Sequence, residues 1–211
     1  MSKLLLATNN PGKLIEIQAL LQDLEVQLLT PEQVGLNLEV VEDGQTYAEN
    51  ARLKGLAFVQ ASGLLTLADD SGLEVDALGG LPGIRSARFA PGASPTSKTS
   101  DAERRAYLLQ RLQGLPRPWT ARFRCVVALV KPGEPGQEVE IRFAEGQCHG
   151  EITPVERGLF GFGYDPIFFF PELGRTLAEL SMEEKNQVSH RARAVMAARP
   201  ELEEMLATFQ R

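Results

Sequence analysis

Two neighbouring acids, Asp69 and Asp70, follow the apolar residues 64–67. The Leu-Leu-Thr-Leu composition of this run predicts a buried strand that ends at the acids. Open α/β sheets bind ligands at the C-terminal ends of their strands, where carboxylates can hold a divalent metal or orient a water molecule. Aspartates also cap turns, and the Ser-Gly pair that follows is predicted to turn the chain into a short second strand at 73–76. The chemical interpretation therefore depends on the rest of the chain.

A second polar stretch follows the first predicted strand and opens a helix. The run KLLLAT at 3–8 predicts a buried strand, and apolar residues at helical spacing predict a helix that starts near Gly12. The backbone N–H groups of such a loop, the helix N-terminus and a lysine form an anion site. The loop lacks the glycine spacing of a Walker A motif, and an ordinary turn with a surface lysine is the alternative. The stretch consists of Thr8, Asn9, Asn10, Pro11, Gly12 and Lys13.

Two further stretches carry residues suited to nucleotides. Residues 157–166 hold three glycines, three aromatic side chains and one acid, and a ring displayed by a glycine loop can stack on a nucleobase. The cations Lys185, His190 and Arg191 are predicted to form a compact set of the kind that binds phosphates or a carbonyl oxygen. The alternatives are aromatic side chains packed against the domain and a solvated helix face.

The intervening segments predict the elements that position these residues. Strands are expected at 26–29, 120–131, 138–148 and 167–170, with a hairpin loop at 132–136 and a small-residue loop at 91–100. Ser or Thr followed three residues later by Glu predicts a capping box at the start of a helix. Such pairs stand where helices are expected to begin: Thr46 with Glu49, Ser100 with Glu103, and Ser181 with Glu184.

Two charged residues near the second helix have open interpretations. Glu42 precedes Gly44 in an acidic loop, and its carboxylate either points into a cleft or is solvated. Lys54 lies near the middle of the helix that is predicted to end at Gly63, and a solvated lysine is the default expectation there. Cys125 lies on the apolar face of the strand at 120–131 and is expected to pack in the core.

Composition limits the function classes. The chain has 211 residues, of which 43% are hydrophobic and 24% charged, as in a globular protein with one large domain or two close lobes. The net charge of -6 argues against non-specific binding to nucleic acid. The two cysteines have no metal-ligand spacing, which favours a reducing, cytoplasmic location. No signal peptide and no apolar run of about 20 residues is present, so no membrane association is expected.

Taken in order, the motifs resemble those of the inosine/xanthosine triphosphate pyrophosphatase family. They span nearly the full length, and together they are highly specific. The matching segments are TNNPGK at 8–13, the EDG-to-KG region at 42–55, ADDSGLEVDALGGLPGIRSARF at 68–89, GFGYDPIF at 161–168, AELSMEEKN at 178–186 and SHRARA at 189–194.

The resemblance implies a fold, a reaction and partners. The fold is α/β, an elongated mixed β-sheet with flanking helices, in which residues 1–211 form one domain of two lobes around a central active-site cleft. The reaction converts ITP, dITP or XTP and water into the monophosphate and pyrophosphate, requires Mg2+, and keeps these noncanonical purines out of DNA and RNA. The resemblance also implies a homodimer.

The resemblance assigns roles to single residues. Asp70 matches the general base and a metal ligand, and Glu42 matches a second metal ligand, with Glu39 as a fallback. Lys54 and Asp69 match less closely, and Glu49 has no role beyond the helix cap. The implied substrate contacts are Thr8, Asn9, Asn10, Pro11, Gly12, Lys13, Ser71, Phe162, Gly163, Tyr164, Asp165, Lys185, His190 and Arg191.

Choice of base requires a donor that faces the 6-keto oxygen of the purine. His190, Arg191 or a backbone N–H of the loop around Phe162 is the expected donor. Two rival functions remain open: a pyrophosphatase for pyrimidine or other modified nucleotides, and a nucleotide sensor without catalysis. The GFGYDP and SHR segments favour the purine enzyme, and the carboxylates favour catalysis, since a pure anion binder gains nothing from them without a metal.

Overall fold

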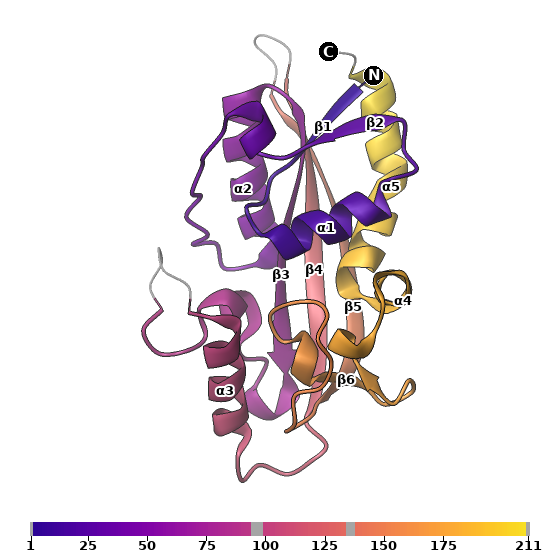
Figure 1. Ribbon diagram of the computed structural model, residues 1–211. Helices are drawn as coiled ribbons and strands as arrows, with labels where there is room; N and C mark the ends of the chain where they lie inside the picture. The colour runs from indigo at the N-terminus through magenta and orange to yellow at the C-terminus, as the bar shows by residue number, and fades with distance from the viewer. Residues whose placement is uncertain (1, 94–98, 134–137, 210–211) are drawn as a thin grey trace. The chain divides into compact units, whose positions relative to one another are not determined.

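The computed structural model describes residues 2–93, 99–133 and 138–209 (Figure 1). The predicted loops at 91–100 and 132–136 lie partly outside these residues. Within the described ranges, no helix is both long and apolar enough to cross a membrane.

Seven strands form one mixed sheet in the described part of the chain, in the order β2-β1-β3-β4-β5-β6-β7. β1 pairs in parallel with β2 and with β3, whereas β6 is antiparallel to β5 and to β7. The strands are β1 (Ser2–Leu6), β2 (Val26–Leu29), β3 (Leu65–Val75), β4 (Thr120–Lys131), β5 (Glu140–Ile152), β6 (Phe168–Phe170) and β7 (Arg175–Thr176). The flanking helices are α1 (Pro11–Leu20), α2 (Tyr47–Ser62), α3 (Asp101–Leu112), α4 (Met182–Val188) and α5 (His190–Thr208).

The chain divides into two compact units. Unit 1 comprises Met1–Asp70, Cys125–Gly146 and Arg191–Arg211, and unit 2 comprises Ser71–Arg124 and Gln147–His190. β3, β4 and β5 each contribute residues to both units. The single two-lobed domain and its central cleft stay predictions.

Unit 1 has a helical layer on each face of its strands. Leu4 and Leu6 of β1 pack in a core with apolar residues of α1 and α5, whereas Leu5 faces the opposite way, towards Phe58 of α2. Figure 1 labels these three helices around β1, β3 and β4. This alternation gives each face of a strand its own chemical surroundings.

Unit 2 has a separate core in which Leu108 and Leu112 of α3 pack with strand residues. Phe123 of β4 lies in this core with its ring centroid 4.7 Å from that of Phe168. Tyr164 belongs to the same cluster, so the loop before β6 is anchored by one of its own aromatic side chains.

Most predicted elements are confirmed, and three details are corrected. β2, β4 and the helix that ends at Gly63 lie where they were predicted, and two capping boxes are complete, those of Ser100 and Ser181. At Thr46 the side chain caps α2, but Glu49 accepts from the N–H of Gln45 at 2.5 Å instead of from that of Thr46. β5 also begins later and extends further than the predicted strand at 138–148.

The third correction concerns the acids. The chain does not turn after Asp70, because β3 continues without a break to Val75. Its neighbour β1 ends at Leu6, which is in register with Leu67. The neighbour of β3 on its other side is β4. Asp69 and Asp70 therefore lie in the middle of a strand, just beyond the end of its parallel partner.

Candidate active site

The two acids of β3 point to opposite faces of the strand because side chains alternate along it. Asp69 continues the row of Leu65 and Leu67, which pack in the core beneath α1 and α5. Asp70 continues the row of Ala68, which packs against α2. Two adjacent carboxyl groups thus meet different neighbours.

Asp69 is a fully buried carboxylate held by two cations. Its Oδ2 lies 2.8 Å from Lys13 Nζ and 3.5 Å from Arg191 Nε. Burial alone would raise the pKa of this carboxyl, but the charges of Lys13, Arg191 and Lys54 outweigh it and hold the pKa below its usual range. Burial likewise lowers the pKa of Lys13, but the facing Asp69 carboxylate leaves it raised overall. Asp69 and Lys13 are therefore both charged at neutral pH.

Arg191 is buried behind this pair and is itself balanced by acids. Its guanidinium forms an ion pair with Glu16 of α1 and reaches Asp69 with its Nε. Glu16 and Arg191 are both almost completely buried. Cys125, the predicted core cysteine, lies in the same place, and its Sγ is 3.8 Å from Asp69 Oδ2. Arg191 thus belongs to an internal network of unit 1.

Asp70 has a less cationic environment on the other face. Its Oδ2 accepts from Asn50 Nδ2 of α2 at 3.0 Å, and Asn50 Oδ1 accepts from the Gly44 N–H at 2.9 Å. Burial raises the pKa of Asp70, Lys54 and Lys13 oppose that rise, and Glu42 adds to it, so the pKa is raised overall. A carboxylate with a raised pKa is a stronger base than an ordinary aspartate.

Lys54 connects the strand to the acidic loop, and the expectation of a solvated lysine is wrong. Its Nζ donates to the Asp69 carbonyl at 2.9 Å and lies 3.3 Å from Glu42 Oε1. The Leu67 carbonyl accepts from the Ala7 N–H, and the Asp69 carbonyl, two residues on, points the same way beyond the end of β1. Lys54 occupies that vacant pairing position, which sequence spacing alone does not reveal.

The oxygen donors near Asp70 fit a magnesium ion. The described residues contain no group of three or more His, Cys, Asp and Glu side chains of the kind that holds a metal alone. Mg2+ is commonly held by one or two carboxylates together with substrate phosphates. Asp70 and Glu42 supply two carboxylates whose charges act on each other.

The predicted anion loop is a helix cap in this state. Asn10 caps α1, and its Oδ1 accepts from the N–H groups of Gly12 and Lys13 at 2.9 and 3.2 Å. Thr8 Oγ1 accepts from the Asn10 N–H at 3.2 Å, and Asn9 Nδ2 donates to the Leu38 carbonyl at 3.0 Å. The helix begins at Pro11, one residue earlier than predicted. Three of the backbone N–H groups expected to bind an anion, those of Asn10, Gly12 and Lys13, therefore already have an internal acceptor.

In unit 2 the predicted base wall is organised by a buried acid. Asp165 Oδ2 lies 2.5 Å from Lys185 Nζ and accepts from the Phe162 N–H at 2.9 Å. The Lys185 ammonium lies 5.3 Å from the centre of the Phe162 ring. Phe162 is half-buried, which leaves part of its ring accessible. One carboxylate thus holds both the Lys185 ammonium and the backbone of Phe162.

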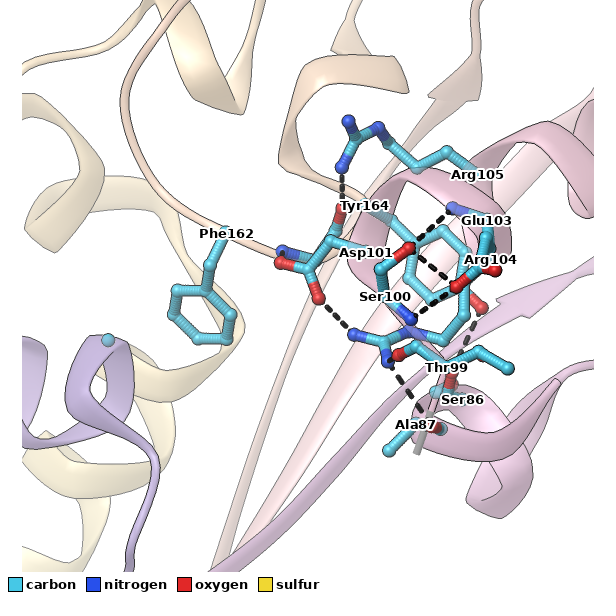
Figure 2. Close-up of polar contacts among 12 residues, drawn as sticks. Ser86, Ala87, Thr99, Ser100, Asp101, Glu103, Arg104, Arg105, Phe162 and Tyr164 are labelled. Atoms are coloured by element: carbon cyan, nitrogen blue, oxygen red, sulfur yellow. Dashed lines mark hydrogen bonds and ion pairs between the residues drawn. The ribbon is translucent and has the colours of Figure 1, made fainter. Parts of the chain in front are cut away.

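Gly163 and Tyr164 are fixed by α3 and its surroundings (Figure 2). The Gly163 N–H donates to Asp101 Oδ2 at 2.6 Å, and its carbonyl accepts from Arg105 at 2.9 Å. Tyr164 is buried, and its hydroxyl donates to the Ser86 carbonyl at 2.9 Å. Burial raises the pKa of this phenol well above its usual range. Tyr164 is therefore an anchor of the loop.

Each member of the predicted cationic set of Lys185, His190 and Arg191 has a partner within its own unit. Lys185 pairs with Asp165, and Arg191 pairs with acids of unit 1. The His190 ring stacks on Phe123 at 4.6 Å with an interplanar angle of 11°. All three side chains are buried, because each has its own partner inside the protein.

Known proteins resemble this chain over nearly its whole length. The sequence profile of the Ham1 family matches residues 4–201. A "dITP/XTP pyrophosphatase" from Desulforamulus reducens is 48% identical over 197 residues, which cover 93% of each chain. One from Shouchella clausii is 45% identical over 206 residues, 96% of this chain and 98% of that one. The solved structure of a HAM1 protein from Coxiella burnetii has a TM-score of 0.80 at 39% identity and covers 97% of this chain and 100% of that one.

The chain belongs to the Ham1 family. The predicted α/β class, with a mixed sheet and flanking helices, is that of the Ham1 structures. The resemblance stated from the motifs is confirmed, since the relatives are dITP/XTP pyrophosphatases.

Two residues of this Ham1 site were missed from the sequence. Asn50 lies four residues before Lys54, so both project from one face of α2 towards β3. Glu16 lies three residues after Lys13 on α1 and pairs with Arg191. The helical spacing to a lysine was the available signal in both cases. The distant partner of each residue could not be read from spacing.

The two neighbouring acids predict opposite effects of the same substitution on stability. Asp69→Asn leaves buried Lys13 and Arg191 without their shared counter-charge and is expected to lower the free energy of unfolding by about 3–5 kcal/mol at pH 7. Asp70→Asn is expected to raise that free energy, because it removes a carboxylate whose ionisation is disfavoured by burial. Urea unfolding of both variants measures this, with Asp23→Asn, a surface acid paired with Arg199, as the control.

The pH dependence of the free energy of unfolding tests the opposite effects of the two substitutions a second time. The folded pKa of Asp70 is raised, so its ionisation reduces the stability of the wild type as the pH rises above the ordinary value of about 3.8. The advantage of Asp70→Asn should therefore be absent below that pH, grow above it and then level off. Ionised Asp69 instead stabilises the folded state, and this stabilisation is lost as the pH falls below 3.8. Equal effects of the two variants at every pH would contradict this account.

Proposed function

We propose that this chain hydrolyses ITP, dITP and XTP to the monophosphate and pyrophosphate, and so keeps noncanonical purines out of DNA and RNA. The observation that carries the proposal is the buried Asp70 carboxylate, with its raised pKa, beside Lys13 and Lys54. The relatives named dITP/XTP pyrophosphatase support the substrate class, since they match almost the whole chain.

Asp70 acts as the general base. Pyrophosphate leaves as a unit, so water must attack the α-phosphorus. The raised pKa of Asp70 lies closer to neutral pH than that of an ordinary aspartate. A carboxylate with such a pKa is still ionised at neutral pH and accepts a proton more readily. The hydrogen bond from Asn50 fixes one carboxylate oxygen, which orients the other.

Lys13 and Lys54 balance the charge of the triphosphate, which is about four negative charges near neutral pH. Asp69 keeps Lys13 protonated at a buried position. The cations reduce repulsion between the attacking water and the phosphates and stabilise the charge that develops on the leaving group. The other residues of the loop at 8–13 and Ser71 are proposed as further substrate contacts.

Asp70 and Glu42 would hold Mg2+, which adds positive charge at the phosphate oxygens when bound. We also propose a homodimer and a reducing, cytoplasmic environment. In the described residues neither Cys125 nor Cys148 forms a disulfide, which agrees with such an environment.

The base is proposed to lie against Phe162, with Lys185 and Asp165 beside it. The N–H groups of Phe162 and Gly163 already donate to Asp165 and Asp101. They are therefore poor candidates for the donor that reads the 6-keto oxygen. Arg191 is likewise already paired, with Glu16 and Asp69, so His190 is the donor that we propose.

The proposed function predicts a product pattern. With Mg2+, ITP, dITP and XTP should each release pyrophosphate, whereas dATP, dGTP and dTTP should release little. Quantifying pyrophosphate and orthophosphate separately identifies the bond that is cut. Orthophosphate as the first product would contradict the proposed attack of water on the α-phosphorus. Binding of ITP without turnover would favour a nucleotide sensor.

Asp70→Asn is expected to fold and to lose turnover of ITP by about 10²–10⁴-fold, because it removes the proton acceptor and keeps the shape. Single-turnover kinetics with ITP bound measures the chemical step. Asp23→Asn provides the matched control and should keep wild-type turnover. Wild-type rates in Asp70→Asn would remove Asp70 from the mechanism.

A further inference from the structure

The loop at 162–165, which is proposed to form one wall of the base pocket, is hydrogen-bonded to the N-terminal turn of α3 (Figure 2). Both backbone hydrogen-bonding groups of Gly163, the residue after Phe162, have partners on this turn. The N–H donates to Asp101 and the carbonyl accepts from Arg105. These two residues are four positions apart and lie on one face of α3.

Asp101 and Arg105 are themselves fixed. Arg105 forms a two-pronged pair with Glu156, at 2.9 and 3.0 Å, which leaves Nη1 for the Gly163 carbonyl. Asp101 pairs with Arg104, whose guanidinium also donates to the carbonyls of Ala87 and Thr99. The Asp101 carboxylate and the Arg105 guanidinium are therefore already held in place as acceptor and donor for Gly163.

Gly163 needs such support because its backbone has a φ of +62°. This left-handed conformation turns the chain between Phe162 and the buried Tyr164. On one side, Asp165 holds the Phe162 N–H. The Phe162 carbonyl also accepts from the Asp165 N–H at 3.1 Å. On the other side, Asp101 and Arg105 of α3 hold the N–H and the carbonyl of Gly163.

We propose that Asp101 and Arg105 are positioning residues for base selection, which act by fixing the backbone behind Phe162. They do not act on the phosphates, whose proposed contacts lie in unit 1. This inference rests on the proposed function. It extends the determinants of base choice to α3, which the motif resemblance did not include.

Asp101→Ala tests the inference. It should raise KM for ITP about tenfold, the loss expected for one hydrogen bond to a charged group, with kcat nearly unchanged. The ratio of kcat/KM for ITP to that for dGTP should narrow by a similar factor. Asp101→Asn keeps an acceptor oxygen for the Gly163 N–H and should restore most of both values. Arg105→Met should act in the same direction as Asp101→Ala.

Glu103→Ala is the matched control on the same turn. Glu103 completes the capping box with Ser100, and the dashed lines drawn from it in Figure 2 lead to Ser100 and not to the loop at 161–165. The control should lower the thermal midpoint, since it weakens the helix cap, and leave KM and the base ratio unchanged.

Three outcomes would overturn the inference. If Asp101→Ala keeps the wild-type KM and base ratio, the contacts do not select the base. If Glu103→Ala changes the ratio equally, the effect is general destabilisation of α3. If the wild type releases no pyrophosphate from ITP, the proposed function itself fails, and this inference fails with it.

Discussion

The site of unit 1 depends on the buried ion pair between Asp69 and Lys13. A lysine with this little exposure keeps its proton only because a carboxylate lies 2.8 Å away. Arg191 adds a second cation to the same carboxylate, and Glu16 balances Arg191 in turn. Removing Asp69 takes the shared counter-charge from both Lys13 and Arg191, which is costly in a medium of low polarity. The network therefore keeps Lys13 charged and fixed within the loop that is proposed to bind the triphosphate.

Asp69 and Asp70 have different environments because they occupy adjacent positions on one strand. Asp69 faces cations and is held ionised, whereas Asp70 faces Asn50 and a second acid and is a stronger base. Two carboxyl groups whose environments push their pKa values apart are a recurrent basis for assigning acid–base roles. Here the alternation of side chains along β3 supplies the two environments without any change of backbone.

Sequence patterns predicted the elements and the identity of the chemistry-bearing residues better than their partners. Residues with a strong local signal, such as Ser100 with its Glu103, lie as predicted, because a capping box is defined within four residues. The turn after Asp70 was wrong because β3 pairs with β4, a strand distant in the sequence. Lys54 was misjudged for a similar reason, since its acceptor is exposed by the end of β1. Arg191 could be assigned to phosphates or to the base, but its internal pairing with Glu16 has no local signature.

The central claim is that one strand gives its two acids opposite electrostatic environments, and direct titration of the two carboxyl groups tests it. NMR of the carboxyl carbons, assigned with the two Asp→Asn variants, follows each group from neutral pH to the acid limit of the fold. The account predicts that Asp70 titrates above the ordinary value of 3.8 and that Asp69 stays ionised well below it. Titration of both groups near 3.8, or in the reverse order, would contradict the assignment of Asp70 as the base and of Asp69 as the anchor of Lys13.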